Sequence, residues 1–263
     1  MPSRFLPLFF SALILFSHSP DLTADPSASL ISYIAENLNK NFQSFQGIKA
    51  YLELELSQPG ISPHHSFAQL AFRLNPDRLY FKTFSPLTPH YFTLISKGGN
   101  FWLQIPKTKT VYTGPLEAIG QENFEMKITP QDFKKIMVPN LTDKTPEDMS
   151  IEDQRTRWDL TLYGHVGTNK FKERILWIQK EGMKMVKDTR YSVDGRPYLE
   201  ISWENFEKTG GTDSFPRLIT LFKPSTGYLL RMKLKKVTLT NNIPEELFEV
   251  TDLASYKTVK VSH

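Results

Sequence analysis

The feature that most constrains this chain is a two-residue alternation of apolar and polar side chains, which begins near Ile48 and returns through most of the sequence. In the first such segment the apolar side chains are Ala50, Leu52, Leu54 and Leu56, and the residues between them are Tyr or Glu. Because successive side chains of a β-strand point to opposite faces, this pattern predicts a strand with one buried and one solvated face.

The alternating segments follow one another as hairpins. Turn-forming residues at 75–77 and 98–100 separate consecutive strands. Further alternation at 158–240 brings the expected total to about 11–12 strands, and a sheet of that size must curl or close. In the last long strand the apolar phase shifts at Lys235 and Lys236, which predicts a β-bulge there.

Residues 25–46 have helical rather than strand spacing. Apolar side chains recur there every three or four positions, including Ile34 and Leu38, with Asn, Lys and Gln opposite them. This spacing predicts an amphipathic helix that precedes the sheet. The chain is therefore expected to be an α+β protein in which a long antiparallel sheet dominates.

A second, shorter helix is expected at 130–138, before the strands resume. Thr129 can cap it, and Pro130 occupies the first helical position, where proline is favoured. The apolar stripe of this helix consists of Phe133, Ile136 and Met137. We expect residues 139–156 to be a polar linker with one helical turn at most.

The N-terminus is typical of an export signal at residues 1–24. Arg4 precedes an apolar run at 5–16, and small residues lie near Ala24. The run is too short to cross a bilayer of about 30 Å, although retention as an uncleaved anchor is the alternative. The remaining residues, 25–263, are expected to form a single domain that is soluble after cleavage. The sequence contains no Cys, so its stability must come from packing alone.

The sequence contains no recognised catalytic arrangement. None of its six histidines lies at metal-ligand spacing from a second ligand, and it has no G-x-S-x-G segment, Cys nucleophile or Gly-rich phosphate loop. We therefore predict no enzyme activity, no metal site and no cofactor. The net charge of +4, which removal of residues 1–24 leaves unchanged, is too dispersed to predict nucleic-acid binding.

Basic residues are concentrated between Lys170 and Arg190. They are interleaved with Glu173, Glu181 and Asp188, which favours a solvated strand face of mixed charge. Contact with a lipid head group or with a partner protein is the alternative interpretation.

The order of elements and three short motifs resemble the LolA/LolB lipoprotein-carrier superfamily. The motifs are FRLNPDRL at 72–79, GNFW at 99–102 followed by Pro106 and Val111-Tyr112, and IPEELF at 243–248. The resemblance covers roughly 28–261 and implies a half-open β-barrel. In that barrel a strongly curved antiparallel sheet surrounds a hydrophobic cavity, covered by the N-terminal helix and the mid-chain helix as a lid. The absence of Cys favours the soluble, carrier-like branch over the lipid-anchored one. A sister branch is the alternative, because the 158–206 region is longer and more aromatic than in a minimal carrier and an extra polar linker follows the lid.

The resemblance also implies a function. It indicates a monomeric periplasmic carrier that holds lipid or lipoprotein acyl chains for transport to the outer membrane, with inner- or outer-membrane transport proteins as partners. The side chains expected to line the cavity are Ile34, Leu38, Leu52, Leu54, Leu70, Phe72, Phe81 and Phe92, and those expected to form the lid are Phe133, Ile136 and Met137. The alternative is a non-enzymatic interaction or scaffold module of the cell envelope whose barrel is filled by side chains.

Overall fold

Every strand in the described part of the chain belongs to one sheet. The computed structural model describes residues 26–43, 45–85, 90–120, 133, 136–138, 145–209, 212–251 and 253–262. The elements are α1 (Pro26–Gln43), β1 (Gly47–Gln58), β2 (Ile61–Arg73), β3 (Arg78–Phe84), β4 (Phe92–Lys97), β5 (Asn100–Ile105), η1 (Pro106–Thr108), β6 (Thr110–Pro115), η2 (Leu116–Gly120), η3 (Pro146–Asp148), β7 (Met149–Asp153), β8 (Arg157–Val166), β9 (Asn169–Gln179), β10 (Lys184–Tyr191), β11 (Pro197–Thr209), β12 (Thr212–Lys223), β13 (Tyr228–Thr240), η4 (Glu245–Phe248), η5 (Leu253–Ser255) and β14 (Lys257–Lys260).

The strands pair in the order β14-β6-β5-β4-β3-β2-β1-β13-β12-β11-β10-β9-β8-β7. All neighbours are antiparallel except β14 and β6, which are parallel. The sheet therefore has two halves, one of β1–β6 together with β14 and the other of β7–β13, which join where β1 pairs with β13. The expectation of 11–12 strands is too low, because the sheet has 14 in the described residues alone.

One of the additional strands lies where a linker was expected. β7 forms within 139–156, directly after the single helical turn η3. It is an edge strand whose Ser150 and Glu152 are exposed, and only Ile151 among its central residues turns toward the core. A short, polar edge strand carries little alternation, which is why the sequence pattern did not indicate it.

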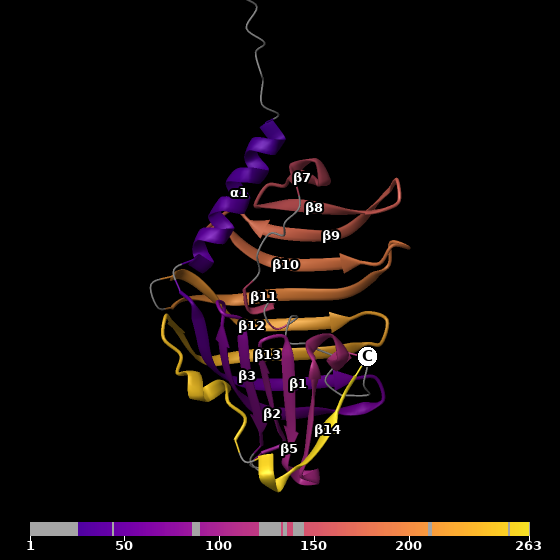
Figure 1. Cartoon of the computed structure of the whole chain (residues 1–263). Helices are drawn as coiled ribbons and strands as arrows, with labels where there is room; N and C mark the ends of the chain where they lie inside the picture. The colour runs from indigo at the N-terminus through magenta and orange to yellow at the C-terminus, as the bar shows by residue number, and fades with distance from the viewer. Residues whose placement is uncertain are drawn as a thin grey trace, which may run out of the picture.

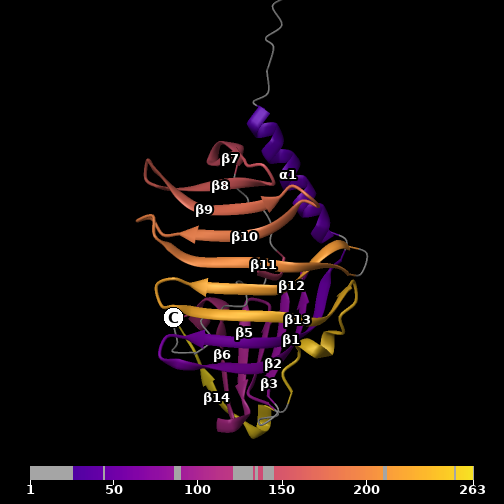
Figure 2. The same cartoon turned by 180° about the vertical axis from the view of Figure 1, so that it is seen from behind.

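The sheet curls strongly without closing. In Figure 1 the strands β8–β13 run across the view, whereas β3 and β5 run steeply to them, and Figure 2 shows the same curvature from behind. The edge strands β14 and β7 are not paired with each other in the described part of the chain. The sheet thus has one concave and one convex side, in agreement with a half-open barrel.

Helix α1 lies against the β7 edge of the sheet, where it contacts β7 and η3 (Figure 1). Ile31, Ile34 and Leu38 are buried, whereas Tyr33 is 55% exposed. The three- and four-residue spacing of the buried side chains gives the helix one apolar stripe, which packs into the main core. The predicted amphipathic helix is therefore confirmed in position and orientation.

The predicted bulge in the last long strand is also confirmed. Tyr51 of β1 is paired with Lys236 of β13, but the next residue, Leu52, is paired with Leu234, so that Lys235 is skipped. The extra residue restores the apolar phase, and Leu234 is buried opposite Leu52.

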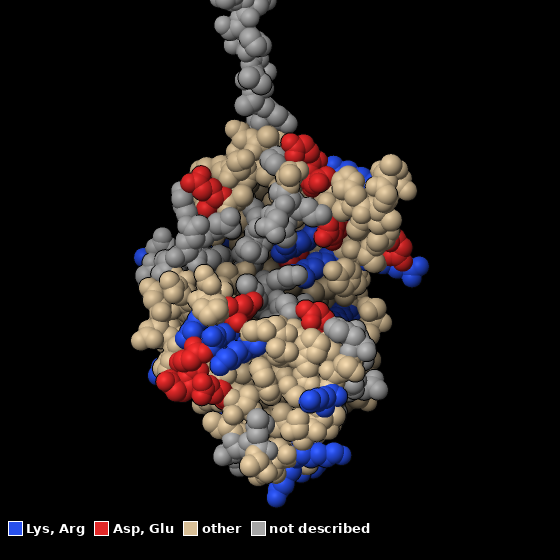
Figure 3. Space-filling model, viewed as in Figure 1, with Lys and Arg blue, Asp and Glu red and all other residues tan. Residues whose placement is uncertain are grey.

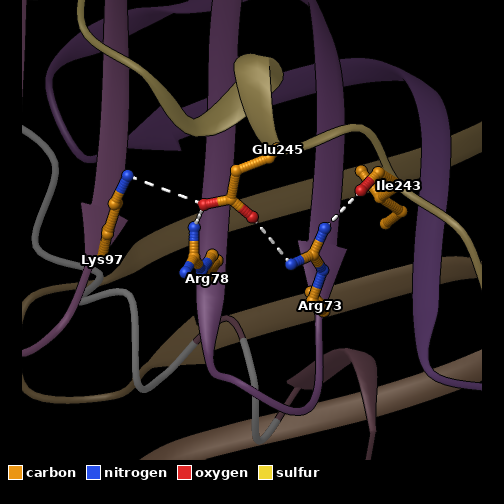
Figure 4. A network of polar contacts seen from close by, with 5 residues as sticks. All are labelled: Arg73, Arg78, Lys97, Ile243 and Glu245. Atoms are coloured by element: carbon orange, nitrogen blue, oxygen red, sulfur yellow. Dashed lines mark hydrogen bonds and ion pairs between the residues drawn. The ribbon is translucent and has the colours of Figure 1, made fainter.

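The C-terminal segment covers part of the convex side. Ile243 and Phe248, at the two ends of the segment that contains η4, bury Ala71 of β2 in a small second cluster. Glu245 forms ion pairs with Arg73, Arg78 and Lys97 there, as Figure 4 shows. These contacts fasten the chain to the outside of β2–β4 before it continues to β14.

Candidate functional site

The residues expected to line a cavity lie in one apolar cluster, which also contains the cores of both halves of the sheet. The buried members are Ile34, Leu38, Leu52, Leu54, Leu70, Phe72 and Phe81, and Phe92 is half-buried. Whether they contact a ligand stays a prediction, but the structure does bring these side chains from α1 and β1–β4 together.

Strand register explains why these side chains share a face. Leu70 of β2 lies directly opposite Ala50 of β1 on one side and Phe81 of β3 on the other. Phe81 in turn lies opposite Leu94 of β4. Because directly paired residues project to the same side of a sheet, this row crosses the concave face. Leu52 and Leu54 follow Ala50 in the same buried phase of β1, and together with the row they form an apolar strip on that face.

The connection between β6 and β7 joins opposite ends of the sheet, since β6 lies next to the edge strand β14 and β7 is the other edge. Phe133, Ile136 and Met137 of this connection have helical conformation and are buried, each about 1% exposed. The ring centroid of Phe133 lies 4.8 Å from that of Phe81, and the carbonyl of Ile136 accepts a hydrogen bond of 2.8 Å from Trp203 Nε1. The segment therefore touches β3 in one half and β11 in the other. Val138 is also buried but forms a bend, and the other residues of the helix expected at 130–138 lie outside the described residues.

The concave face of the second half contains charged residues that sequence analysis placed on a solvated surface. Arg174 of β9 and Asp188 of β10 are buried, and Arg190 is nearly so. Arg174 Nε donates to Asp188 Oδ1 at 2.8 Å, and Arg190 Nε donates to Oδ2 at 3.2 Å. For these three residues the expectation of a solvated face is wrong.

The sequence pattern could have placed Arg174 on the buried face, but not Asp188. Arg174 is in the same two-residue phase as Leu176 and Ile178, which are both fully buried. In β10, however, a register shift between Met185 and Lys187 breaks the phase, so Asp188 cannot be assigned to a face by counting.

A polar cavity of about 490 Å³ lies on the convex side, between β3–β5 and the C-terminal segment. Its lining includes Tyr80, Lys82, His90 and Glu249. Burial raises the pKa of Tyr80, and burial together with the positive charge of Lys82 lowers the pKa of His90. His90 Nε2 lies 2.7 Å from Thr93 Oγ1, a contact that orients the ring.

Among the described residues, no three His, Asp or Glu side chains lie close enough to hold a metal ion. Within the same residues, no helix is both long and apolar enough to cross a membrane.

Sequence comparison identifies no relatives, since no protein-family profile matches the chain and no curated protein resembles it. Solved structures do resemble it. A LolA superfamily protein from Nitrosomonas europaea covers 86% of this chain and 99% of its own, with 16% identity and a TM-score of 0.59. A domain assigned to outer membrane lipoprotein sorting, from Vibrio parahaemolyticus, covers 82% of this chain and 94% of its own, with 12% identity and a TM-score of 0.58.

A third structure, a DUF1329 family protein from Desulfovibrio piger, covers 85% of this chain and 97% of its own, with 9% identity and a TM-score of 0.60. At these identities the likeness is one of fold. The chain therefore has a LolA-like fold, as the resemblance of its motifs predicted.

Proposed function

From the LolA-like fold we propose that the protein is a non-enzymatic periplasmic carrier of lipid or lipoprotein acyl chains, which it takes to the outer membrane. The observation that carries this proposal is the apolar strip on the concave face, which belongs to the same buried apolar cluster as Ile34 and Leu38 of α1. Each CH₂ group removed from water contributes about 0.8 kcal/mol, so an apolar interior can retain an acyl chain without polar recognition of it. We expect the carrier to act as a monomer and to exchange cargo with transport proteins of the inner or outer membrane.

Cargo entry requires the mid-chain segment to move. Phe133, Ile136 and Met137 occupy the space between the two halves of the sheet, where an acyl chain would lie. A helix of this expected length is too short to be stable alone, so its order depends on docking. Local opening costs least where few contacts break, and we therefore propose that this segment is the lid.

Placing a carboxylate on the apolar strip tests the binding site. We expect Leu54→Asp to weaken binding of a fluorescent fatty acid by about tenfold or more, because an unpaired charge in an apolar interior is strongly unfavourable. The matched control is Phe222→Asp, since Phe222 lies on the convex side and is 36% exposed. A Leu54→Asp protein that melts cooperatively and binds the probe as tightly as Phe222→Asp would exclude this strip.

The hydrogen bond between Trp203 and the lid allows a second test. Trp203→Phe keeps an aromatic ring but removes the donor to the Ile136 carbonyl, and a hydrogen bond of this kind contributes about 1 kcal/mol. We expect faster probe uptake and release, measured by stopped-flow fluorescence. The control is Trp102→Phe, because Trp102 of β5 lies on the convex side of the sheet, away from the lid. Equal rates in both variants would mean that Phe133, Ile136 and Met137 belong to a static core.

The burial of Phe133, Ile136 and Met137 also favours a second candidate function. If the lid side chains fill the interior permanently, the protein is an interaction or scaffold module of the cell envelope. That module would take up no probe in any variant, whereas a carrier takes up the probe in the unaltered protein.

A further inference from the structure

Two arginines face each other on the concave side of the second half. Strand register places Leu162, Arg174, Arg190 and Leu199 in one row across β8, β9, β10 and β11. The adjacent row contains Leu176, Asp188 and Ile201, directly paired. All of these leucines and the isoleucine are buried in the main apolar cluster. Because paired residues project to the same side of a sheet, Arg174, Arg190 and Asp188 lie on the apolar, concave side.

The charges in this cluster do not balance. Asp188 is completely buried and accepts one hydrogen bond from each arginine. Among the described residues, one carboxylate therefore offsets two guanidinium groups, which leaves a single positive charge among buried leucines. Like charges directly opposite each other destabilise a sheet, and a buried charge without a counter-ion is costly. A second anion at this place would remove that cost.

The arginines also keep donors for such an anion. A guanidinium group carries five N–H donors, and Asp188 engages only the Nε edge of each. The terminal nitrogens of Arg174 and Arg190 have no hydrogen-bond or ion-pair partner among the described residues. Neither side chain is completely buried, since 10% of the Arg174 side chain and 13% of the Arg190 side chain are exposed. In Figure 3, basic side chains are visible within a recess at the level of β9 and β10.

We propose that Arg174 and Arg190 form an anion-binding subsite that takes the phosphate or carboxylate head group of the bound amphiphile. This subsite rests on the proposed carrier function, since the acyl chains would lie on the neighbouring apolar strip. The planar fork of arginine matches the paired oxygens of a phosphate or carboxylate, and such charge-assisted hydrogen bonds are stronger in a weakly solvated site. Asp188 is a positioning residue, because it holds both Nε edges and leaves the terminal nitrogens to the ligand.

The test compares ligands that share one alkyl chain. Binding of dodecyl phosphate, dodecanoic acid and dodecanol is measured by displacement of a fluorescent probe, and inorganic phosphate is tested alone by calorimetry. We expect the two anionic amphiphiles to bind about tenfold more tightly than dodecanol, the range of one charge-assisted hydrogen bond. We expect added salt to reduce this preference, and inorganic phosphate alone to bind weakly.

The variant Arg190→Gln leaves Asp188 paired with Arg174 at 2.8 Å and is therefore the variant of choice. It should lose most of the preference for the anionic ligands and keep its affinity for dodecanol, whereas Arg190→Lys should keep part of the preference. The control is Arg231→Gln, which removes the same charge from an exposed ion pair with Glu55. If Arg190→Gln fails to fold, the comparison of anionic and neutral ligands in the unaltered protein still decides whether the protein prefers an anionic head group.

Distinct outcomes separate this subsite from the carrier function. Equal binding of the anionic and neutral ligands, unchanged in Arg190→Gln, would overturn the subsite and leave the carrier function standing. Tight binding of inorganic phosphate with no uptake of any amphiphile would show that the anion is free rather than a lipid head group, and would overturn both proposals.

Discussion

The two halves of the sheet have concave faces of different character. Across β1–β5, the side chains that point to the concave face include no Lys, Arg, Asp or Glu. That face is built from side chains such as Leu52, Leu70 and Phe81. The face of β9 and β10 carries Arg174, Asp188 and Arg190 among equally buried leucines. One half thus presents no charged side chain on its concave face, whereas the other presents the two guanidinium groups that we propose as the anion subsite. An amphiphile needs both kinds of surface, and this difference is the reason to expect one as the ligand.

The largest effect should come from removing the central carboxylate. Asp188→Asn leaves two buried guanidinium groups without their counter-ion, and breaking a buried ion pair in this way costs about 3–5 kcal/mol. The free energy of unfolding, measured by urea denaturation, checks this. A loss below about 1 kcal/mol would mean that the cluster is solvated and that the two faces do not differ as described.

Replacing the whole cluster sharpens the comparison. Substituting Arg174→Met, Asp188→Leu and Arg190→Met together should restore or raise the stability, since apolar residues of similar volume often replace buried ion pairs at no cost. The same protein should bind dodecyl phosphate no better than dodecanol. Retained preference for the phosphate would place the anion elsewhere.

The loss of stability caused by a cavity should be similar in the two halves of the sheet. Leu70 and Leu176 lie on the concave faces of the first and the second half, at 2% and 0% exposure. Leu→Ala at either position should reduce the free energy of unfolding by about 2–5 kcal/mol. A much smaller loss at Leu70 would indicate a looser first half, already open to a ligand.

A smaller effect is expected on the convex side. Glu245 is 42% exposed, so Glu245→Gln should cost about 1 kcal/mol or less, although the carboxylate contacts three basic residues. Added salt should weaken the ion pairs and shrink this cost. A loss comparable to that of Asp188→Asn would show that the C-terminal segment is a main determinant of stability.

The smallest effect is a pH dependence at the convex cavity. The pKa of His90 is lowered from 6.5 by burial and by Lys82, so the unfolded chain binds this proton more readily than the folded protein. Stability should therefore fall slightly as the pH drops through 6.5, and His90→Asn should reduce that slope. A slope that is identical in the two proteins would remove His90 as its source.

The sequence pattern predicted most of the first half and less of the second. Regular alternation in β1–β3 identified strands, faces and the residues of the apolar strip, and the phase shift at Lys235 located the bulge. In β10 a bulge hid the inward position of Asp188, because the phase on one side of it does not carry over to the other. Nor could β7 be recognised, since a short edge strand depends on pairing with β8 rather than on its own composition.

Native mass spectrometry of the purified protein tests the central claim most directly. A carrier of amphiphiles should show, beside the polypeptide, additional mass that organic extraction removes, and the released molecules should combine acyl chains with an anionic head group. After extraction the protein should take up dodecyl phosphate again. A single mass before extraction, together with no uptake of any amphiphile afterwards, would contradict the account and indicate a filled interior.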